Sequence, residues 1–100
     1  MTLRKSFISM LHRFQDKIIY TSESGTKVEI TLEASYPIND IEKTAQSLKE
    51  KRIRECRIEK IFHAGKQTCY IITVSGAWAI GLYEECPFLK EQVEKGVYTC

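Results

Sequence analysis

The sequence predicts one α+β domain: a five-stranded antiparallel sheet with helices on both faces, in the order α-β-β-α-β-β-β-α. Three observations lead to this prediction. Residues 27–34 alternate between apolar and polar side chains, as a half-buried strand does. Residues 55–83 contain three consecutive strand-like runs separated by glycine-containing turns. Residues 3–14 instead place apolar side chains at helical spacing, which predicts an amphipathic helix.

The first half of the chain is expected to supply a helix, a hairpin and a second helix. The first helix covers residues 3–15, and its apolar stripe consists of Leu3, Phe7, Ile8, Leu11 and Phe14. A strand over 16–21, a turn at Gly25 and a strand over 27–34 follow. Because the strand over 27–34 is apolar on one side only, we expect it at an edge of the sheet. Asn39 is expected to cap a helix that buries a narrow stripe of Ile41, Ala45 and Leu48.

The second half is expected to form three sequential strands and a closing helix. The strand over 55–63 places Cys56, Ile58 and Phe62 on one face and charged residues on the other. The strands over 68–74 and 77–83 are apolar on both faces, which predicts positions in the middle of the sheet. A last helix should start at Pro87 and stop at Gly96. The domain therefore covers residues 1–96, with a short tail over 97–100.

Composition limits the function classes. One hundred residues are enough for one domain with a single core. The 15 basic and 13 acidic residues give a net charge of +2, which favours neither nucleic acid nor an acidic membrane as a partner. No apolar run approaches the length that spans a bilayer, and the amino end lacks the unbroken apolar segment of a signal peptide. We therefore expect a cytoplasmic protein.

The sequence contains no recognisable catalytic, metal-binding or cofactor motif. The four cysteines, Cys56, Cys69, Cys86 and Cys100, form no C-x-x-C pair, so we expect reduced core thiols and a free terminal thiol rather than a zinc site. The five glycines are scattered singly and do not form a phosphate-binding loop. His63 and Cys69 come near each other at a predicted hairpin, but nothing supplies an orienting acid. These observations predict a protein that is not an enzyme and needs no cofactor.

Several short runs, together with the order of the elements, match a known family pattern. The runs are the Gly25 turn, residues 58–62 through Gly65, residues 70–74, Gly76, residues 78–82 and the closing Phe88-Leu89 helix. On these features the chain resembles the roadblock/LC7 family, a relative of longin and profilin-like folds, over residues 3–95. The resemblance implies a non-enzymatic dimer, formed with itself or with a related roadblock-like chain. It also implies binding or regulation of a Ras-like small GTPase.

The resemblance places the pairing surface on the edge strand and the second helix. Mapped by position, this surface consists of Ile41, Ala45, Leu48, Arg57, Ile58, Glu59 and Ile61. The residues support the mapping independently, because the strand over 55–63 is expected to end the sheet with unpaired backbone groups. Two other functions stay open. One is a nucleic-acid-binding module that uses the basic residues of segment 49–57, although Glu50 and Glu55 interrupt them. The other is a small inhibitor from a mobile element that occupies a host protein.

Overall fold

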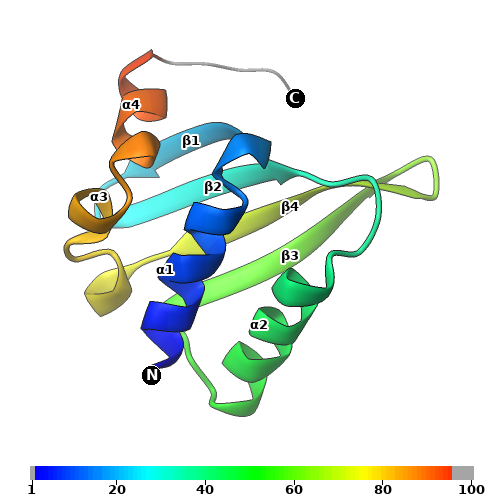
Figure 1. Ribbon diagram of the computed structural model, residues 1–100, viewed down its shortest axis with the longest axis horizontal. Coiled ribbons are helices and arrows are strands. Elements are labelled where there is room, and N and C mark those ends of the chain that lie inside the picture. Colours follow the sequence, from blue (N-terminus) through cyan, green and yellow to red (C-terminus); the bar gives the residue numbers. More distant parts are fainter. Residues whose placement is uncertain (1, 96–100) are drawn as a thin grey trace.

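Four antiparallel strands form one sheet in the order β1-β2-β4-β3 (Figure 1). The structure is a computed structural model that describes residues 2–95, and the side chains of residues 2–91. The strands are β1 (Ile18–Ser24), β2 (Lys27–Glu33), β3 (Cys56–His63) and β4 (Lys66–Val74). Strands β2 and β4 lie in the interior of the sheet, and β1 and β3 form its two edges.

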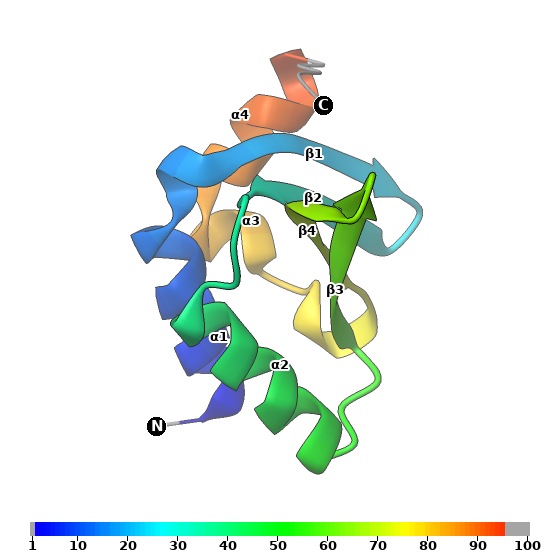
Figure 2. The ribbon, with the colours of Figure 1, turned by 90° about the vertical axis from the view of Figure 1, so that its right-hand side faces the viewer.

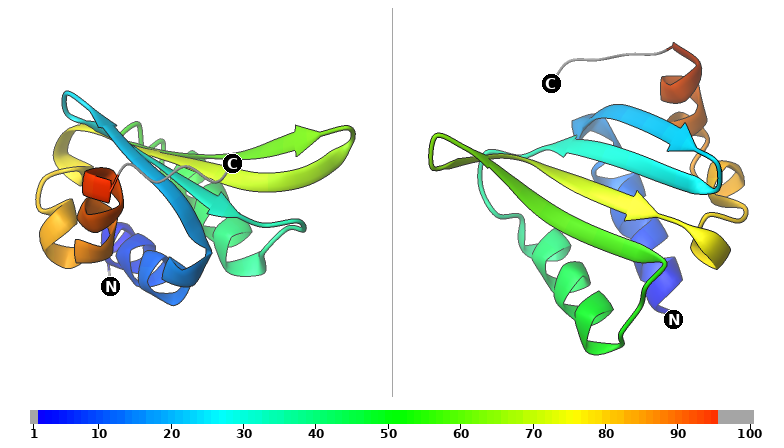
Figure 3. Two further views of the ribbon diagram at one scale, coloured as in Figure 1. Left: turned by 90° about the horizontal axis from the view of Figure 1, so that it is seen from above. Right: turned by 180° about the vertical axis from the view of Figure 1, so that it is seen from behind.

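Two long helices cover one face of this sheet. They are α1 (Leu3–Arg13) and α2 (Asn39–Glu50), and both lie on the same side of the strands (Figures 1 and 3). The short helix α3 (Leu82–Glu85) leads into α4 (Pro87–Lys95), and α4 packs beside β1 (Figure 2). Two 3₁₀ turns, η1 (Gln15–Lys17) and η2 (Gly76–Trp78), connect these elements. Seen from behind, the strands lie uncovered in front of the helices (Figure 3).

The hydrophobic core lies between the covered face of the sheet and the helices. Among its most deeply buried members, each at most 3% exposed, are Phe7, Leu11, Ile41 and Leu48 from the helices and Ile30, Leu32, Tyr70, Ile72 and Val74 from the strands. Full burial of one such aliphatic side chain contributes about 1.5–3 kcal/mol. The apolar stripes that the sequence predicted for α1 and α2 are confirmed, since they meet in one core with Tyr70, Ile72 and Val74 of β4 and with Cys56 and Ile58 of β3. Phe62, the third apolar residue predicted for that face of β3, is exposed and lies outside this core.

The predicted fifth strand is wrong: residues 77–83 form the turn η2 and the start of α3. Gly76 and Gly81 have φ values of +55° and +73°, which interrupt an extended backbone. Trp78 and Leu82 reach the core at a helical spacing of four, while Ile80, which a strand would place beside them, is 75% exposed. The Arg4 guanidinium donates to the carbonyl of Ile80 at 2.9 Å and so holds this turn against α1.

The expected positions of β2 and of the helices are also wrong. We predicted β2 at an edge because its charges lie on one side, but it pairs with both β1 and β4. Its charged residues alternate with Val28, Ile30 and Leu32, which are buried in the core, so they lie on the opposite face of the sheet. That face carries no helix within residues 2–95 (Figure 3). The charged residues on one side of β2 therefore indicate that this face of the sheet is uncovered, and not that β2 is an edge strand. The prediction of helices on both faces is also wrong, because α1 and α2 lie on the same face of the sheet (Figures 1 and 3).

Smaller differences concern the ends of the elements. Ile38 occupies the N-cap position of α2, and Asn39, the predicted cap, is the first residue of the helix. The first strand starts at Ile18 and continues to Ser24, beyond its predicted end. Pro87 does begin the last helix. The predicted stop at Gly96 and the tail over 97–100 lie outside the described residues. In the part of the chain that is described, no helix is long and apolar enough to cross a membrane.

Candidate functional site

The edge strand β3 presents backbone hydrogen-bonding groups outward. Within residues 2–95, β3 pairs only with β4. The Ser75 N–H donates to the carbonyl of Glu55 at 2.8 Å, so the backbone groups of Glu55 face β4. Orientation alternates along an antiparallel strand. The N–H and C=O groups of Cys56, Ile58 and Lys60 therefore point away from the sheet.

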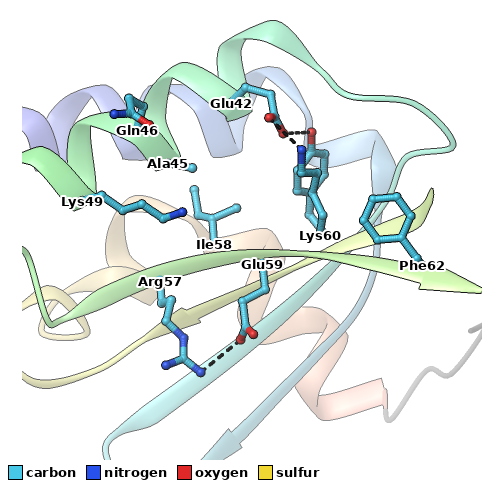
Figure 4. A pocket seen from close by; sticks show the side chains of 10 residues that line it. Glu42, Ala45, Gln46, Lys49, Arg57, Ile58, Glu59, Lys60 and Phe62 are labelled. Atoms are coloured by element: carbon cyan, nitrogen blue, oxygen red, sulfur yellow. Dashed lines mark hydrogen bonds and ion pairs between the residues drawn. The ribbon is translucent and has the colours of Figure 1, made fainter. Parts of the chain in front are cut away.

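A groove of about 580 Å³ runs between this edge and α2 (Figure 4). Its walls combine apolar and charged side chains from both elements. They are Glu42, Ala45, Gln46 and Lys49 from α2, Arg57, Ile58, Glu59, Lys60 and Phe62 from β3, and Tyr70 from β4. A groove beside an open strand edge is the geometry in which proteins accept an added strand, because backbone hydrogen bonds hold the strand and the groove receives its side chains.

A hydrogen-bonded cluster closes one end of the groove. The Tyr70 hydroxyl donates to Glu42 Oε2 at 2.6 Å and accepts from the Ile38 N–H at 3.0 Å. Lys60 Nζ donates to Glu42 Oε1 at 3.1 Å. The bond from Tyr70, helped by Lys60, lowers the pKa of Glu42 below its ordinary value. Burial, and then the bond to Glu42, raise the pKa of Tyr70. The cluster fixes the start of α2 against β3.

An ion pair lies on the opposite side of β3 from the groove's helix. Arg57 Nη2 is 3.2 Å from Glu59 Oε1, and the two side chains are 74% and 49% exposed. Figure 4 shows both pointing away from α2, while Ile58 and Lys60 point toward it. An exposed pair of this kind contributes little to the stability of the fold, typically about 0–1 kcal/mol. Its charges therefore remain available to a partner.

The predicted pairing surface divides into three parts. Ala45, Arg57, Ile58 and Glu59 line the groove together. Ile41 and Leu48 are 0% and 3% exposed, so they hold α2 on the sheet and are not surface residues. Ile61 is half-buried and stands opposite Cys69 on the uncovered face of the sheet.

Sequence reasoning did not include six groove residues in the pairing surface: Glu42, Gln46, Lys49, Lys60, Phe62 and Tyr70. Lys60 carried a usable signal, because it is a charged residue on the face where Cys56 and Ile58 are apolar. Phe62 was expected in the core, yet it is 58% exposed. The register of β3 against β4 shifts between Ile61 and Phe62, where β4 has one extra residue, Thr68. Phe62 lies near the β3–β4 turn, which extends beyond α2 (Figure 1), so it lines the groove without reaching the core.

A second hollow, of about 360 Å³, lies between the β1–β2 turn and α3. The Tyr83 hydroxyl donates to Glu23 at 2.7 Å across it, and the exposed Ile80 forms part of its rim. Burial and the bond to Glu23 raise the pKa of Tyr83. This hollow is lined mainly by the β1–β2 turn and by residues of segment 76–83, whereas the groove at β3 runs along a strand, so the groove is the better candidate for binding a polypeptide.

The cysteines and the basic segment give no comparable site. Burial raises the pKa of Cys56 to about 12 and that of Cys86 to about 11, and a thiol with so little thiolate is a poor nucleophile. No group of three metal-ligating side chains occurs among the described residues. The basic residues of the alternative nucleic-acid function are exposed: Lys49, Lys51, Arg52 and Arg54 around the α2–β3 loop, and Arg57 on β3. Cys100 lies outside the described part of the chain.

Comparison with protein-family models, with curated proteins and with solved structures found no match for this chain. The resemblance to the roadblock/LC7 family therefore stays a prediction from the sequence. The five-stranded sheet that was expected with it is absent from the described residues. Any function has to be argued from the geometry of the β3 edge and its groove.

Proposed function

We propose that this chain is a non-enzymatic interaction module that forms a homodimer through β3 and α2. The observation that carries the proposal is the open edge of β3, whose outward backbone groups adjoin a groove lined by α2. A second copy of the same strand satisfies those groups by extending the sheet, and a symmetric pair of this kind is the commonest soluble oligomer.

The composition of β3 supports this use of the edge. Proteins that keep an edge strand from pairing shorten it, add proline or point like charges outward. Strand β3 is eight residues long and has no proline. Its charges alternate in sign, with Arg57 two residues before Glu59. An edge built in this way accepts a strand that carries the complementary order of charges.

The outer side of α2 is also complementary to itself. Glu42, Ala45 and Lys49 all line the groove, so they share one side of the helix. When two copies of α2 approach antiparallel, the acidic start of one meets the basic end of the other. Ala45 is small and lies near the middle, where two helices come closest.

The proposal includes a scaffold role, since dimerisation through β3 leaves the second hollow and the uncovered face of the sheet for another protein. The proposal also includes regulation of a Ras-like small GTPase and a cytoplasmic location, and these two parts are supported by the sequence alone. Both are testable. Purified chain should change the rate of GTP hydrolysis or nucleotide release by at least one GTPase in a panel, and a tagged chain should fractionate with the cytosol. Inactivity across the panel would remove the GTPase part.

The homodimer is tested with one substitution made at two places. Ile58→Lys puts a charge at the edge of the sheet, beside the groove, whereas Ile71→Lys puts the same charge on interior strand β4. Light scattering should give twice 11.6 kDa for the wild type and for Ile71→Lys, and 11.6 kDa for Ile58→Lys. Thermal unfolding checks that each variant is folded. A dimer that survives Ile58→Lys would contradict the proposed surface.

A further inference from the structure

The backbone of β3 restricts how a second copy can pair with it. In the part of β3 that pairs regularly with β4, Cys56–Ile61, the residues Cys56, Ile58 and Lys60 present their N–H and C=O groups outward, so each must face an outward residue across an antiparallel interface. Such a pair has a two-fold axis perpendicular to the sheet, which keeps residues of one face opposite residues of the same face. Registers centred on Cys56 or Lys60 bring only one of these three residues opposite another of them, which leaves the registers centred on Arg57, Ile58 or Glu59.

The register centred on Ile58 uses the outward groups best. It places Ile58 opposite Ile58 of the partner subunit and Cys56 opposite Lys60 of the partner subunit. All three outward residues then face an outward residue. A centre at Arg57 leaves Lys60 without such a partner, and a centre at Glu59 places Cys56 opposite Phe62 of the partner subunit, beyond the part of β3 that pairs regularly with β4.

The charges on the uncovered face favour the same register. With the axis at Ile58, Arg57 lies opposite Glu59 of the partner subunit, and the symmetry makes this opposite-charge pair twice. With the axis at Arg57, two arginines face each other and Glu59 faces Glu55 of the partner subunit. With the axis at Glu59, two glutamates face each other. Directly opposite like charges destabilise a pair of strands.

From these two independent restrictions we infer that the homodimer forms in one register, with its two-fold axis at Ile58 and with reciprocal Arg57–Glu59 pairs between subunits. The inference rests on the proposed homodimer and names its partner surface. The intrachain pair between these residues, 3.2 Å apart and exposed, exists once in each subunit, so two intrachain pairs exchange for two pairs across the interface. Ile58, buried at the groove, meets its copy and continues the apolar floor into the partner.

Charge reversal tests the register through a rescue. Arg57→Glu and Glu59→Arg each turn both intersubunit pairs into like-charge pairs. We expect each variant alone to dimerise about tenfold more weakly than the wild type, since each cross-strand pair has a modest strength. Mixed one to one, they restore both opposite-charge pairs, so native mass spectrometry should show the heterodimer in excess of either homodimer. Glu33→Arg, an exposed position on β2, serves as the control and should leave the affinity unchanged.

A cysteine experiment separates the three registers directly. Residues facing each other without backbone bonds between them have Cα atoms about 4.5 Å apart, a distance that a disulfide spans. In a Cys100→Ser background, Arg57→Cys and Glu59→Cys are oxidised with oxidised glutathione, singly and mixed, and peptide mapping locates the bridge. The inferred register bridges only the mixture.

Each other outcome overturns a defined part. A bridge in Arg57→Cys alone places the axis at Arg57, and one in Glu59→Cys alone places it at Glu59. If the wild type dimerises but the mixture of Arg57→Glu and Glu59→Arg shows no excess of heterodimer, the inferred register is wrong and the proposed homodimer is unaffected. A wild type that is monomeric at every concentration overturns the proposed function and the register with it.

Discussion

A proline on β3 tests which backbone groups the edge leaves open. The N–H of Lys60 points outward, so Lys60→Pro removes no bond between β3 and β4. An edge strand tolerates proline at such a position. Lys60→Ala is the matched control, because it loses the same ion pair to Glu42 but keeps the N–H. The two variants should have melting temperatures within a few degrees of each other.

The same proline should weaken the dimer strongly. In a symmetric pair, Lys60→Pro deletes two intersubunit hydrogen bonds, each with a net strength of about 1 kcal/mol. The loss of about 2 kcal/mol corresponds to roughly a 30-fold higher dissociation constant than for Lys60→Ala. Sedimentation across a dilution series measures this difference. If Lys60→Pro and Lys60→Ala have equal dissociation constants, the N–H of Lys60 does not donate a hydrogen bond to the partner subunit.

Proline one position earlier should behave in the opposite way. The N–H of Glu59 faces β4, so Glu59→Pro breaks the sheet within the subunit and strands an acceptor on β4. We expect a loss of about 2–4 kcal/mol in the free energy of unfolding. For a domain of this size, that loss lowers the melting temperature by roughly 10–30 °C. If Glu59→Pro has the melting temperature of the wild type, the N–H of Glu59 does not face β4 and the assignment of inward and outward backbone groups in β3 is wrong.

Three further predictions concern the fold that supports the groove. Tyr70→Phe removes the hydroxyl bound to Glu42 and the Ile38 N–H and should cost about 1–3 kcal/mol in urea unfolding; a cost near zero would contradict the cluster. The folded-state pKa of Glu42 is lowered, so its carboxylate stabilises the fold above pH 4.5, and this stabilisation is lost as pH falls through the folded pKa. Thermal unfolding of Glu42→Gln should therefore depend less on acid pH than that of the wild type, and parallel curves would argue against this assignment. Gly81→Ala forces a side chain to adopt a φ of +73° and should lower stability by about 1–2 kcal/mol, more than Gly81→Asn does, because asparagine tolerates this region; equal stability of the two variants would show that the turn relaxes.

Local periodicity predicted most elements because burial is decided residue by residue. The stripe of α1 and the alternation of β2 and β3 each mark the side that meets the core, and the run of β4, apolar on both faces, marks an interior strand. All four elements exist close to their predicted bounds. The run over 77–83 misled because it is apolar throughout. Such a run fits a buried strand as well as turns that touch the core at Trp78 and Leu82.

Long-range arrangement was the harder part. Strand order depends on which strands meet, and the one-sided charges of β2 could come from an edge or from an uncovered face. The groove shows the same limitation. The sequence named Ala45, Arg57, Ile58 and Glu59, but the link from Tyr70 through Glu42 to Lys60 joins three elements. No spacing along the chain encodes it.

The central claim is that two copies of this chain pair through β3. Its most direct test is the mass of the purified wild type by light scattering across a dilution series, at low and at high salt. We predict a species of twice 11.6 kDa that dissociates on dilution, and dissociates earlier at high salt, because the intersubunit charge pairs are exposed. A mass of 11.6 kDa at every concentration and both salt levels would contradict the claim.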